Sequence, residues 1–305
     1  MRTVDFSEVK AAFAAANYLW SIPTAMAVVI TMWLRALRWR NLLGPMKRIG
    51  NYSSFSSVMV GFMANNVLPI RLGEIVRALS ISRKEGISRS GAFATIVVER
   101  VFDSFAILFM LGTCLVIMPF PAIVRRAGYL TFFMNLVALI VLFAFSKWPD
   151  RTARIASVIA NILPSKIGAF LLRLTNRFVE GLGIFHDRLG MLRVAIFTAI
   201  IWVITAISNY CIFIAFGIYP PLIASFVLLI VVAFAVMLPS SPGFIGTFQY
   251  GCVLALSLFH ISKNNSFPIS IVLWSSQYFP VTILGLYYLR RESFSLTDVG
   301  AEKII

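Results

Sequence analysis

The chain has 305 residues, of which 59% are hydrophobic and only 13% are charged, and its mean hydropathy is +0.88. Soluble domains carry roughly 45–50% apolar and about 25% charged residues, so this composition excludes an ordinary soluble protein. The net charge of +15 does not indicate nucleic-acid binding, because the Lys and Arg residues flank apolar runs, as in the cytoplasmic loops of membrane proteins. The sequence therefore predicts an all-α, polytopic helical membrane protein.

Apolar runs of about membrane-spanning length recur along the whole chain. A helix needs roughly 20 apolar residues to cross a bilayer, and runs without polar alternation favour helices over a β-barrel. We expect seven spans within a single transmembrane domain that covers residues 1–305. The expected spans are Tyr18–Leu34, Gly91–Met118, Gly128–Phe145, Val194–Gly217, Pro221–Leu238, Phe244–His260 and Pro268–Leu289.

Three arginines and a tryptophan follow the first apolar run, in the segment Arg35-Ala36-Leu37-Arg38-Trp39-Arg40. Basic residues and tryptophan gather where membrane helices leave the hydrocarbon core. We therefore interpret this segment as an interfacial anchor at the cytoplasmic end of the first span.

The apolar piece Phe55–Ile70 is short, and its polar end contains Asn65, Asn66 and Pro69. Proline cannot donate a backbone hydrogen bond and disfavours helix at the residue before it, so the chain is expected to bend at Leu68. More Lys and Arg residues fall on the inside if this piece returns than if it crosses, which favours a re-entrant segment. That topology places the N-terminus outside and the C-terminus inside.

Charged residues follow this bend at helical spacing. Arg71, Glu74 and Arg77 lie three residues apart and would share one helical face. Two guanidiniums suit a phosphate, and Glu74 would orient one of them, so with Asn65 and Asn66 this is a candidate headgroup site. A solvated helix start carrying ordinary surface charges explains the spacing equally well.

A second charged cluster lies inside an expected span. Glu99 and Asp103 are four residues apart and face the same way, and Arg100 can pair with Asp103. Each charge near a helix centre costs about 2.5–3.5 kcal/mol on insertion scales, so these residues need partners or a polar cavity. We expect all three to face the interior, partnered by Arg71 or Arg77, in a substrate cavity or in a structural ion network.

The basic stretch Ser146–Arg193 joins two spans and is expected to form a cytoplasmic connection over about residues 146–193. Its apolar residues repeat at helical spacing, which predicts amphipathic helices. Helices on the membrane surface and helices packed against the bundle are both compatible with this pattern.

Two prolines and two glycines interrupt the apolar sequence in the second half of the chain. Amides exposed at the start of the following helix would form an anion site, and the glycines would allow close approach. A plain hairpin turn between two spans is the simpler explanation of this segment taken alone. The residues concerned are Pro239, Pro242, Gly243, Gly246 and, in the following helix, Gln249.

The two interrupted segments, one in each half of the chain, form a pair. Broken apolar helices in corresponding positions are the best sequence indication of a transporter's central site. No nucleophile–base pair, zinc motif, phosphate-binding loop or nicotinamide fingerprint accompanies them, and the three cysteines and two histidines are scattered. We therefore expect anion and headgroup binding, with no catalytic residues, no metal and no cofactor.

Taken together, these motifs resemble the transmembrane region of lysylphosphatidylglycerol synthases, a family also described as flippase-like membrane proteins. Their order and spacing both fit, over nearly the whole chain. One departure is Gln249, which stands where the resemblance leads us to expect an acidic residue. The matching motifs are Arg38-Trp39, Asn65-Asn66-x-Leu68-Pro69-x-Arg71-x-Gly73-Glu74-x-x-Arg77, Glu99-Arg100-x-x-Asp103 and Pro239-x-x-Pro242-Gly243-x-x-Gly246.

The resemblance implies a helical membrane domain that binds or moves lipids. Synthases of this family pass an aminoacylated phospholipid across the bilayer, and other members are associated with polyprenyl-phosphate-linked sugars, hopanoids and envelope glycan assembly. Because aminoacyl transfer needs a soluble domain, we do not expect this chain to be a complete synthase. The leading hypothesis is a lipid translocase of a prokaryotic cytoplasmic (inner) membrane, acting on an anionic phospholipid or a polyprenyl-phosphate-linked lipid.

Two alternatives stay open at this point. A membrane-bound glycosyltransferase using a lipid carrier would need acidic residues, and Glu74, Glu99 and Asp103 are the candidates. A non-transporting scaffold would hold a lipid- or glycan-synthesis enzyme at the membrane through the basic 146–193 region. The expected partners are the bilayer, an anionic lipid and, in the scaffold case, that enzyme; no nucleic acid is expected.

Overall fold

The computed structural model describes residues 6–68, 72–120, 122–238 and 241–292, and within these ranges the chain forms helices and no strand. The expected all-α fold class is therefore confirmed. The described residues also include the short 3-10 turns η1 (Tyr18–Trp20), η3 (Gly183–His186) and η4 (Pro242–Phe244). The α-helices are α1 (Phe6–Ala15), α2 (Ser21–Leu43), α3 (Asn51–Val67), α4 (Gly73–Glu85), α5 (Arg89–Ile117), α6 (Ala122–Lys147), α7 (Pro149–Ile162), α8 (Ser165–Gly181), α9 (Arg188–Ala215), α10 (Ile223–Met237), α11 (Thr247–Ser257) and α12 (Lys263–Arg291).

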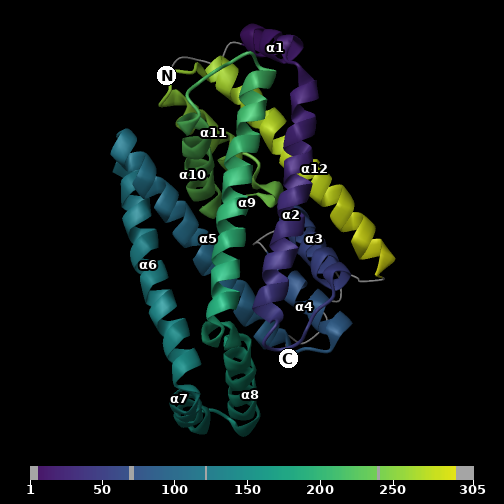
Figure 1. Cartoon of the computed structure of the whole chain (residues 1–305), viewed down its shortest axis with the longest axis vertical. Helices are drawn as coiled ribbons and strands as arrows, with labels where there is room; N and C mark the ends of the chain where they lie inside the picture. The colour runs from purple at the N-terminus through teal and green to yellow at the C-terminus, as the bar shows by residue number, and fades with distance from the viewer. Residues whose placement is uncertain (1–5, 69–71, 121, 239–240, 293–305) are drawn as a thin grey trace.

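Five helices in the described ranges are long and apolar enough to cross a membrane, and they correspond to five of the expected spans. They are α2 with the preceding turn η1, α5, α6, α9 and α12, and they form the bundle seen in Figure 1. The first of them continues well past the expected end at Leu34, because α2 ends only at Leu43.

The remaining apolar segments form two helical hairpins. Helices α3 and α4 pack against each other around the bend that follows Leu68, and α10 packs against α11 around the break before Gly246. Helix α10 has 15 residues and α11 has 11. Fifteen residues of helix span about 22 Å, less than the roughly 30 Å hydrocarbon core, so the count of seven full crossings stays a prediction.

The α3–α4 hairpin begins and ends at the same end of the molecule. Lys47 Nζ, before α3, lies 3.1 Å from the Glu85 carboxylate at the end of α4. Lys84 Nζ lies 2.5 Å from the carboxylate of Glu292, which directly follows α12. The chain therefore returns to its starting side, as the re-entrant interpretation of Phe55–Ile70 requires.

The two hairpins approach from opposite ends, and their tips meet in the middle of the molecule (Figure 1). Asn66 Nδ2, at the end of α3, donates to Thr282 Oγ1 of α12 at 2.9 Å. Trp274 Nε1 of the same helix donates to the Gly243 carbonyl oxygen of η4 at 2.7 Å. Gly243 has φ +69, and a Cβ there would lie 2.8 Å from the Tyr278 ring and 3.4 Å from the Asn66 carbonyl oxygen. Only glycine satisfies both this backbone conformation and this space.

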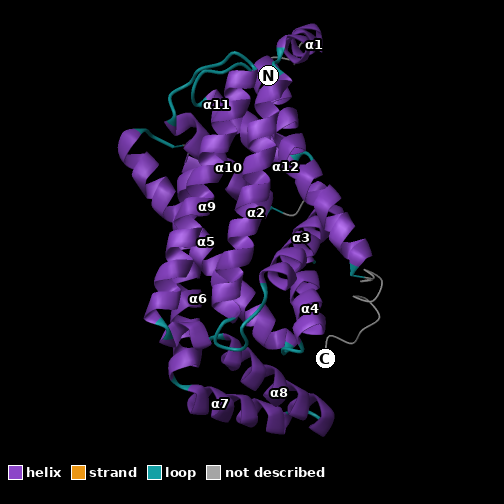
Figure 2. Cartoon of the chain, turned by 45° about the vertical axis from the view of Figure 1, so that its right-hand side comes forward, coloured by secondary structure: helices purple, strands orange, loops and turns teal. Residues whose placement is uncertain are grey.

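The expected connection over residues 146–193 contains a second kind of hairpin, formed by α7 and α8, which lies across one end of the bundle in Figure 2. Helix α8 packs along α5, where a Cβ on Gly181 would overlap the Gly91 carbonyl group. Helix α7 instead leaves Ile155, Ile159 and Ile162 exposed. Packing against the bundle therefore describes α8, whereas α7 keeps a free apolar face.

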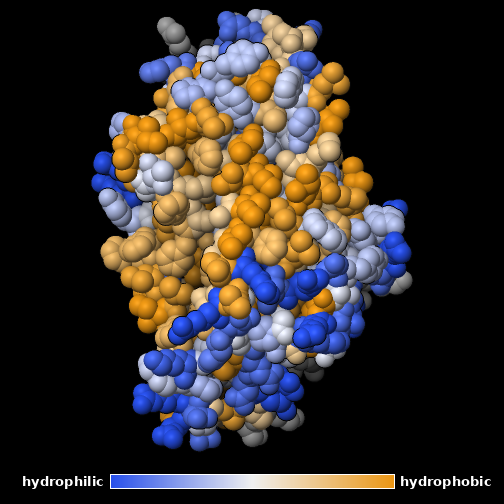
Figure 3. Space-filling view, viewed as in Figure 1, coloured by the Kyte–Doolittle hydropathy of each residue, from blue (hydrophilic) through white to orange (hydrophobic). Residues whose placement is uncertain are grey.

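The surface agrees with a membrane environment. Figure 3 shows a broad hydrophobic area across the middle of the molecule, and hydrophilic residues gather at the end that carries α7 and α8. Side chains such as Phe109, Phe133 and Ile283 are more than half exposed within this chain. Lipid is the environment in which such a surface is stable.

Candidate functional site

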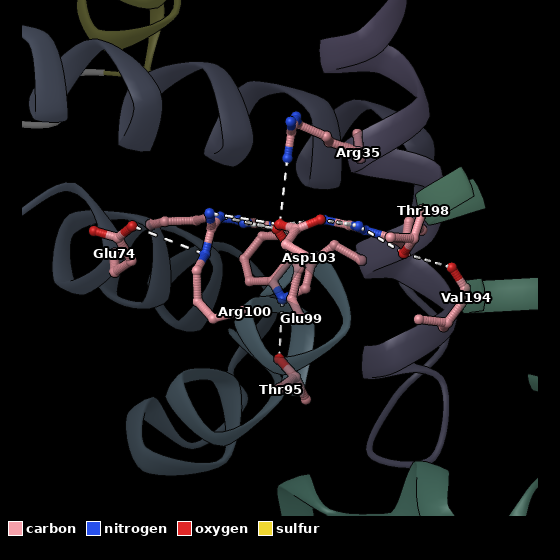
Figure 4. Close-up of polar contacts among 12 residues, drawn as sticks. Arg35, Glu74, Thr95, Glu99, Arg100, Asp103, Val194 and Thr198 are labelled. Atoms are coloured by element: carbon pink, nitrogen blue, oxygen red, sulfur yellow. Dashed lines mark hydrogen bonds and ion pairs between the residues drawn. The ribbon is translucent and has the colours of Figure 1, made fainter. Parts of the chain in front are cut away.

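Seven charged side chains meet inside the bundle, where α2, α4 and α5 pack together (Figure 4). Helix α5 places Glu99 about 15 Å from its own start, and Asp103 a further turn along, near the middle of the span. Within the described residues this network contains four guanidiniums and three carboxylates. Its members are Arg35 and Arg38 of α2, Glu74 and Arg77 of α4, and Glu99, Arg100 and Asp103 of α5.

One half of the network, which we call the closed half, consists of Arg38, Arg77, Glu99 and Trp39. Arg77 donates two hydrogen bonds to Glu99, at 2.9 and 2.8 Å, and Arg38 Nη2 lies 3.0 Å from the same carboxylate. The Arg77 guanidinium lies 3.9 Å from the centre of the Trp39 ring, and Trp39 Nε1 donates to Thr95 Oγ1 at 2.9 Å. The charged side chains of this half are at most 2% exposed.

Asp103 links the closed half to α9. It accepts hydrogen bonds from Arg38 at 2.6 and 3.1 Å and from Trp202 Nε1 at 3.0 Å. Arg38 also donates to Thr198 Oγ1 at 2.8 Å. Sequence reasoning missed Thr198 and Trp202, although a threonine and a tryptophan four residues apart within an apolar span would share a helical face.

The other half, which we call the open half, consists of Arg35, Arg100 and Glu74. Arg100 has a side chain that is 40% exposed, and it lies 3.1 Å from the Glu99 carboxylate and 4.0 Å from that of Glu74. Arg35 makes a single 3.5 Å hydrogen bond to Asp103. The Nε atoms of Arg35 and Arg100 are buried without a hydrogen-bond partner, as are those of Arg38 and Arg77 in the closed half.

Aromatic rings hold the Arg35 guanidinium in place. Its Cζ lies 5.4 Å from the centre of the Phe62 ring and 5.7 Å from that of Trp202. Arg100 lies 5.9 Å from the same Phe62 ring. Cation–π contacts orient a guanidinium without using its N–H donors.

A cavity of about 390 Å³ adjoins the open half and extends to the meeting point of the two hairpin tips. Arg35 and Arg100 contribute cations to its wall, and Glu74 and Asp103 contribute carboxylates. Asn66, Gly243 and Gln277 line its far side. The cavity is therefore polar on one wall and lies within the membrane-spanning part of the molecule.

The interpretation of the segment after the first span as an interfacial anchor is wrong for Arg38 and Trp39, which are fully buried, and for Arg35, which is 8% exposed. The physical reason is the pair of carboxylates at Glu99 and Asp103, whose burial requires cations on a facing helix. Arg35 and Arg38 lie one helical turn apart and supply them. Two acids four residues apart inside an apolar span were the signal for such partners.

The expectation that Glu99, Arg100 and Asp103 face the protein interior is confirmed. Glu99 and Asp103 are buried, at 0% and 4% exposure, and Arg100 lines the cavity. Glu99 pairs with Arg77 as expected. Asp103 instead pairs with Arg38, a residue that the sequence analysis assigned to the membrane interface.

The other residues of the first expected site have different positions. Asn65 Oδ1 accepts a hydrogen bond from Gly73 N at 2.8 Å and so closes the start of α4. Arg77 belongs to the closed half and does not line the cavity, whereas Asn66 and Glu74 do. Arg71 lies outside the described residues, so its expected role as a headgroup ligand stays a prediction.

The second expected site, around the break before α11, contributes mainly backbone. Gly243 lines the cavity, and Pro242 begins the η4 turn. Gly246 N donates to Gln249 Oε1 at 2.7 Å, so the glutamine occupies one amide of the expected anion site. Pro239 lies outside the described residues. Among the described residues, no three His, Cys, Asp or Glu side chains gather in a metal-binding arrangement.

Comparisons with known proteins place this chain in a family. Residues 1–285 match the family described as the lysylphosphatidylglycerol synthase TM region. The chain is 24% identical to the glycosyltransferase AglD of Haloferax volcanii, over 81% of its own length but only 44% of that protein. It is 23% identical to a UPF0104 membrane protein of Methanothermobacter thermautotrophicus, over 97% of this chain and 92% of the relative.

A further UPF0104 membrane protein, from Methanocaldococcus jannaschii, is 25% identical over 85% of this chain and 80% of its own length. No solved structure gives a significant match. The family match, the membrane-protein relatives and the five long apolar helices agree with one another. The chain is therefore an integral membrane protein that belongs to the family of the lysylphosphatidylglycerol synthase transmembrane region.

Proposed function

We propose that this chain is a lipid translocase of a prokaryotic cytoplasmic membrane, and that it binds the headgroup of an anionic phospholipid or a polyprenyl-phosphate-linked lipid. The observation that carries the proposal is the open half of the ion network. There, two arginines, Arg35 and Arg100, line a cavity within the bundle, and the Arg100 side chain is 40% exposed.

The charge balance of the network favours an anionic ligand. Four guanidiniums face three carboxylates, so one positive charge has no counterpart among the described members of the network. A charge near the centre of a membrane protein needs a partner or a polar cavity. A phosphate supplies the missing negative charge and oxygen acceptors for the guanidinium group of Arg100, whose side chain is 40% exposed.

The arrangement of the hairpins supports movement of that ligand. In secondary transporters the substrate site lies near the bilayer midplane, where two interrupted helices from the two halves of the chain meet. Here the α3–α4 and α10–α11 hairpins enter from opposite ends, and both tips border the cavity through Asn66 and Gly243.

A test of this proposal measures lipid movement in proteoliposomes with fluorescent phosphatidylglycerol and, in parallel, phosphatidylcholine. We expect the wild-type protein to move the anionic lipid faster. Arg100→Gln should weaken the apparent affinity roughly 10- to 150-fold, since a charge-assisted hydrogen bond contributes about 1.5–3 kcal/mol. Arg100→Lys keeps the charge but loses the planar guanidinium, so its apparent affinity should lie between those of the wild type and Arg100→Gln.

Arg126→Gln on α6 is the matched control, because Arg126 is exposed and lies outside the network. Wild-type protein that moves neither lipid, or that moves both lipids equally and is unaffected by Arg100→Gln, would contradict the proposal. Expression and thermal stability of each variant are measured in parallel, so that loss of folding is distinguished from loss of binding.

A second candidate function is a lipid-dependent glycosyltransferase, which the similarity to AglD favours. This chain spans less than half of that protein, so the activity in that name comes to this chain only as a hypothesis. The acids also bear on it. Glu99 and Asp103 are each paired with arginines, which leaves Glu74 as the more available carboxylate. Transfer of a radiolabelled sugar to a polyprenyl phosphate by the purified protein, abolished in Glu74→Gln, would support this function over transport.

The third hypothesis, a scaffold for a lipid- or glycan-synthesis enzyme, places the partner on the α7–α8 hairpin. Its supporting feature is the exposed apolar face of α7, with Arg151 and Arg154 on the same helix. Removal of that apolar face by Ile155→Ser and Ile159→Ser distinguishes a scaffold from a translocase. A scaffold loses its partner in this variant, whereas a translocase still moves lipid in liposomes that contain no other protein.

A further inference from the structure

A second hollow, which we call the apolar groove, lies beside the polar cavity between α5, α9 and α10. Its volume is about 630 Å³, within the range of about 300–1,000 Å³ that is typical of ligand sites. Phe105 and Phe109 of α5, Ala195 and Ala199 of α9, and Phe226 of α10 form its walls.

The hydroxyl and indole groups that line the groove have no free hydrogen-bond donor for a ligand. Thr113 Oγ1 donates to the Phe109 carbonyl oxygen at 3.0 Å, and Thr198 Oγ1 donates to the Val194 carbonyl oxygen at 2.8 Å. Trp202 Nε1 is engaged by Asp103. A polar ligand would lose its hydrogen bonds to water here without replacement, so the surface suits a hydrocarbon chain.

One side chain separates the apolar groove from the polar cavity. Trp202 lines both, and its ring lies 5.7 Å from the Arg35 guanidinium. Thr198 also lines the groove while it accepts a hydrogen bond from Arg38 of the ion network. The two sites are therefore adjacent, with charges on one side of the tryptophan and only apolar surface on the other.

Helix α5 determines the direction in which the groove runs. The network residues occupy its middle, and the groove continues along the same helix from Phe102 to Ile117. Those residues cover about 22 Å of helix, which exceeds half of the roughly 30 Å hydrocarbon core. Phe109 and Ile117 are 78% and 66% exposed, so the groove is open to the side of the molecule.

We infer that the apolar groove holds the hydrocarbon tail of the lipid whose headgroup occupies the polar cavity, with Trp202 as the wall over which the lipid bends. The inference rests on the proposed function and specifies it. The ligand is a single amphipathic molecule, and it enters sideways between α5 and α9. Its tail thereby stays in an apolar environment while its headgroup reaches Arg35 and Arg100.

The test uses phosphatidylglycerol that carries a photoactivatable diazirine in its acyl chain, with the full chain reconstituted in nanodiscs. Cross-linked residues are mapped by mass spectrometry, and lipid movement is measured on the same variants in proteoliposomes. Ala199→Phe fills the groove, and Ala195→Phe fills it one turn earlier on the same wall. Ile200→Phe is the matched control, because Ile200 is exposed on α9 but does not line the groove.

We expect wild-type cross-links on Phe109, Met110 and Thr113. They should fall about tenfold in Arg100→Gln, in line with the loss of one charge-assisted hydrogen bond, while cross-links from surrounding lipid elsewhere stay constant. Both groove-filling variants should lose these cross-links and move lipid at least several-fold more slowly, whereas Ile200→Phe should behave as wild type.

Two results overturn the inference and leave the proposed function intact. One is lipid movement at the wild-type rate in both groove-filling variants, and the other is groove cross-linking that Arg100→Gln does not change. Wild-type protein that moves no anionic lipid overturns the proposed function, and the tail site with it. The three results are distinguishable because the headgroup and the groove are altered by separate substitutions.

Discussion

The closed and the open halves of the ion network use the same residue types and differ in what surrounds them. In the closed half, Arg77 and Arg38 enclose Glu99, and no water or ligand can reach the carboxylate. In the open half, the Arg100 side chain is 40% exposed and lines the cavity together with Arg35. The comparison teaches that an arginine enclosed together with its carboxylate stabilises the fold, whereas an arginine at a cavity wall is available to a ligand.

The largest expected difference between the halves is in stability. Arg77→Met leaves Glu99 without its bidentate partner and should cost about 3–5 kcal/mol, whereas Arg100→Met at the cavity wall should cost about 1 kcal/mol or less. Thermal unfolding in detergent, followed by size-exclusion chromatography, measures both. Equal losses of stability would abolish the distinction between a closed and an open half.

A second way to sharpen the comparison is to disturb the hairpin that brings Arg77 to the closed half. A Cβ on Gly73 would overlap the Gly61 carbonyl group across α3 and α4, so Gly73→Ala should destabilise by about 1–3 kcal/mol. Gly112→Ala is the control, because no atom lies within 4 Å of the added carbon. It should be neutral or stabilise α5 by about 0.5–1 kcal/mol. The reverse order of the two melting temperatures would refute the close helix contact.

A smaller effect on stability is expected at Trp39, whose ring packs against the Arg77 guanidinium of the closed half. Trp39→Phe removes the hydrogen bond to Thr95 and leaves a smaller ring under the Arg77 guanidinium, which should cost about 1 kcal/mol. Trp20→Phe at the exposed end of the same span should change stability by less than about 0.5 kcal/mol. A comparison of the two melting temperatures tests whether the closed half depends on this ring.

The smallest effect on stability is expected at the surface, where the hairpin that carries Arg77 begins and ends. Lys47→Cys breaks an exposed pair with Glu85 and should cost less than about 1 kcal/mol. The topology test uses positions 47–48 and 83–84, of which 47, 48 and 83 are exposed and suit single-cysteine labelling in a background without the native cysteines. Both positions should react with a membrane-impermeant reagent from the same side. Reaction from opposite sides would show that the segment crosses the bilayer.

Much of this organisation was predictable from the sequence, because hydrophobic run length and the cost of buried charge act locally. The long spans and the inward direction of Glu99 and Asp103 follow from those two rules. The breaks at Leu68 and before Gly246 follow from proline and glycine chemistry. The choice of partner for Asp103 does not, because it depends on how α2 and α5 face each other.

The role of Arg38 and Trp39 was therefore misjudged for a specific reason. Both types of residue are common at membrane interfaces, and the run of apolar residues before them ends at Leu34. Helix α2 nevertheless continues for two further turns and buries both side chains against α5. Likewise, Arg77 and Arg100 both belong to charged clusters in the sequence, and the packing around them determines which one reaches the cavity.

The contacts of α12 have a mechanical consequence. The tip of one hairpin is fastened to Thr282 and the tip of the other to Trp274, so both are attached to the same short stretch of one helix. Pro280 lies within that stretch and cannot donate to the carbonyl group one turn earlier, which makes this the most easily bent part of the helix. Because Pro280 lies between the two attachment points, a bend of α12 at this residue would change the position of one tip relative to the other.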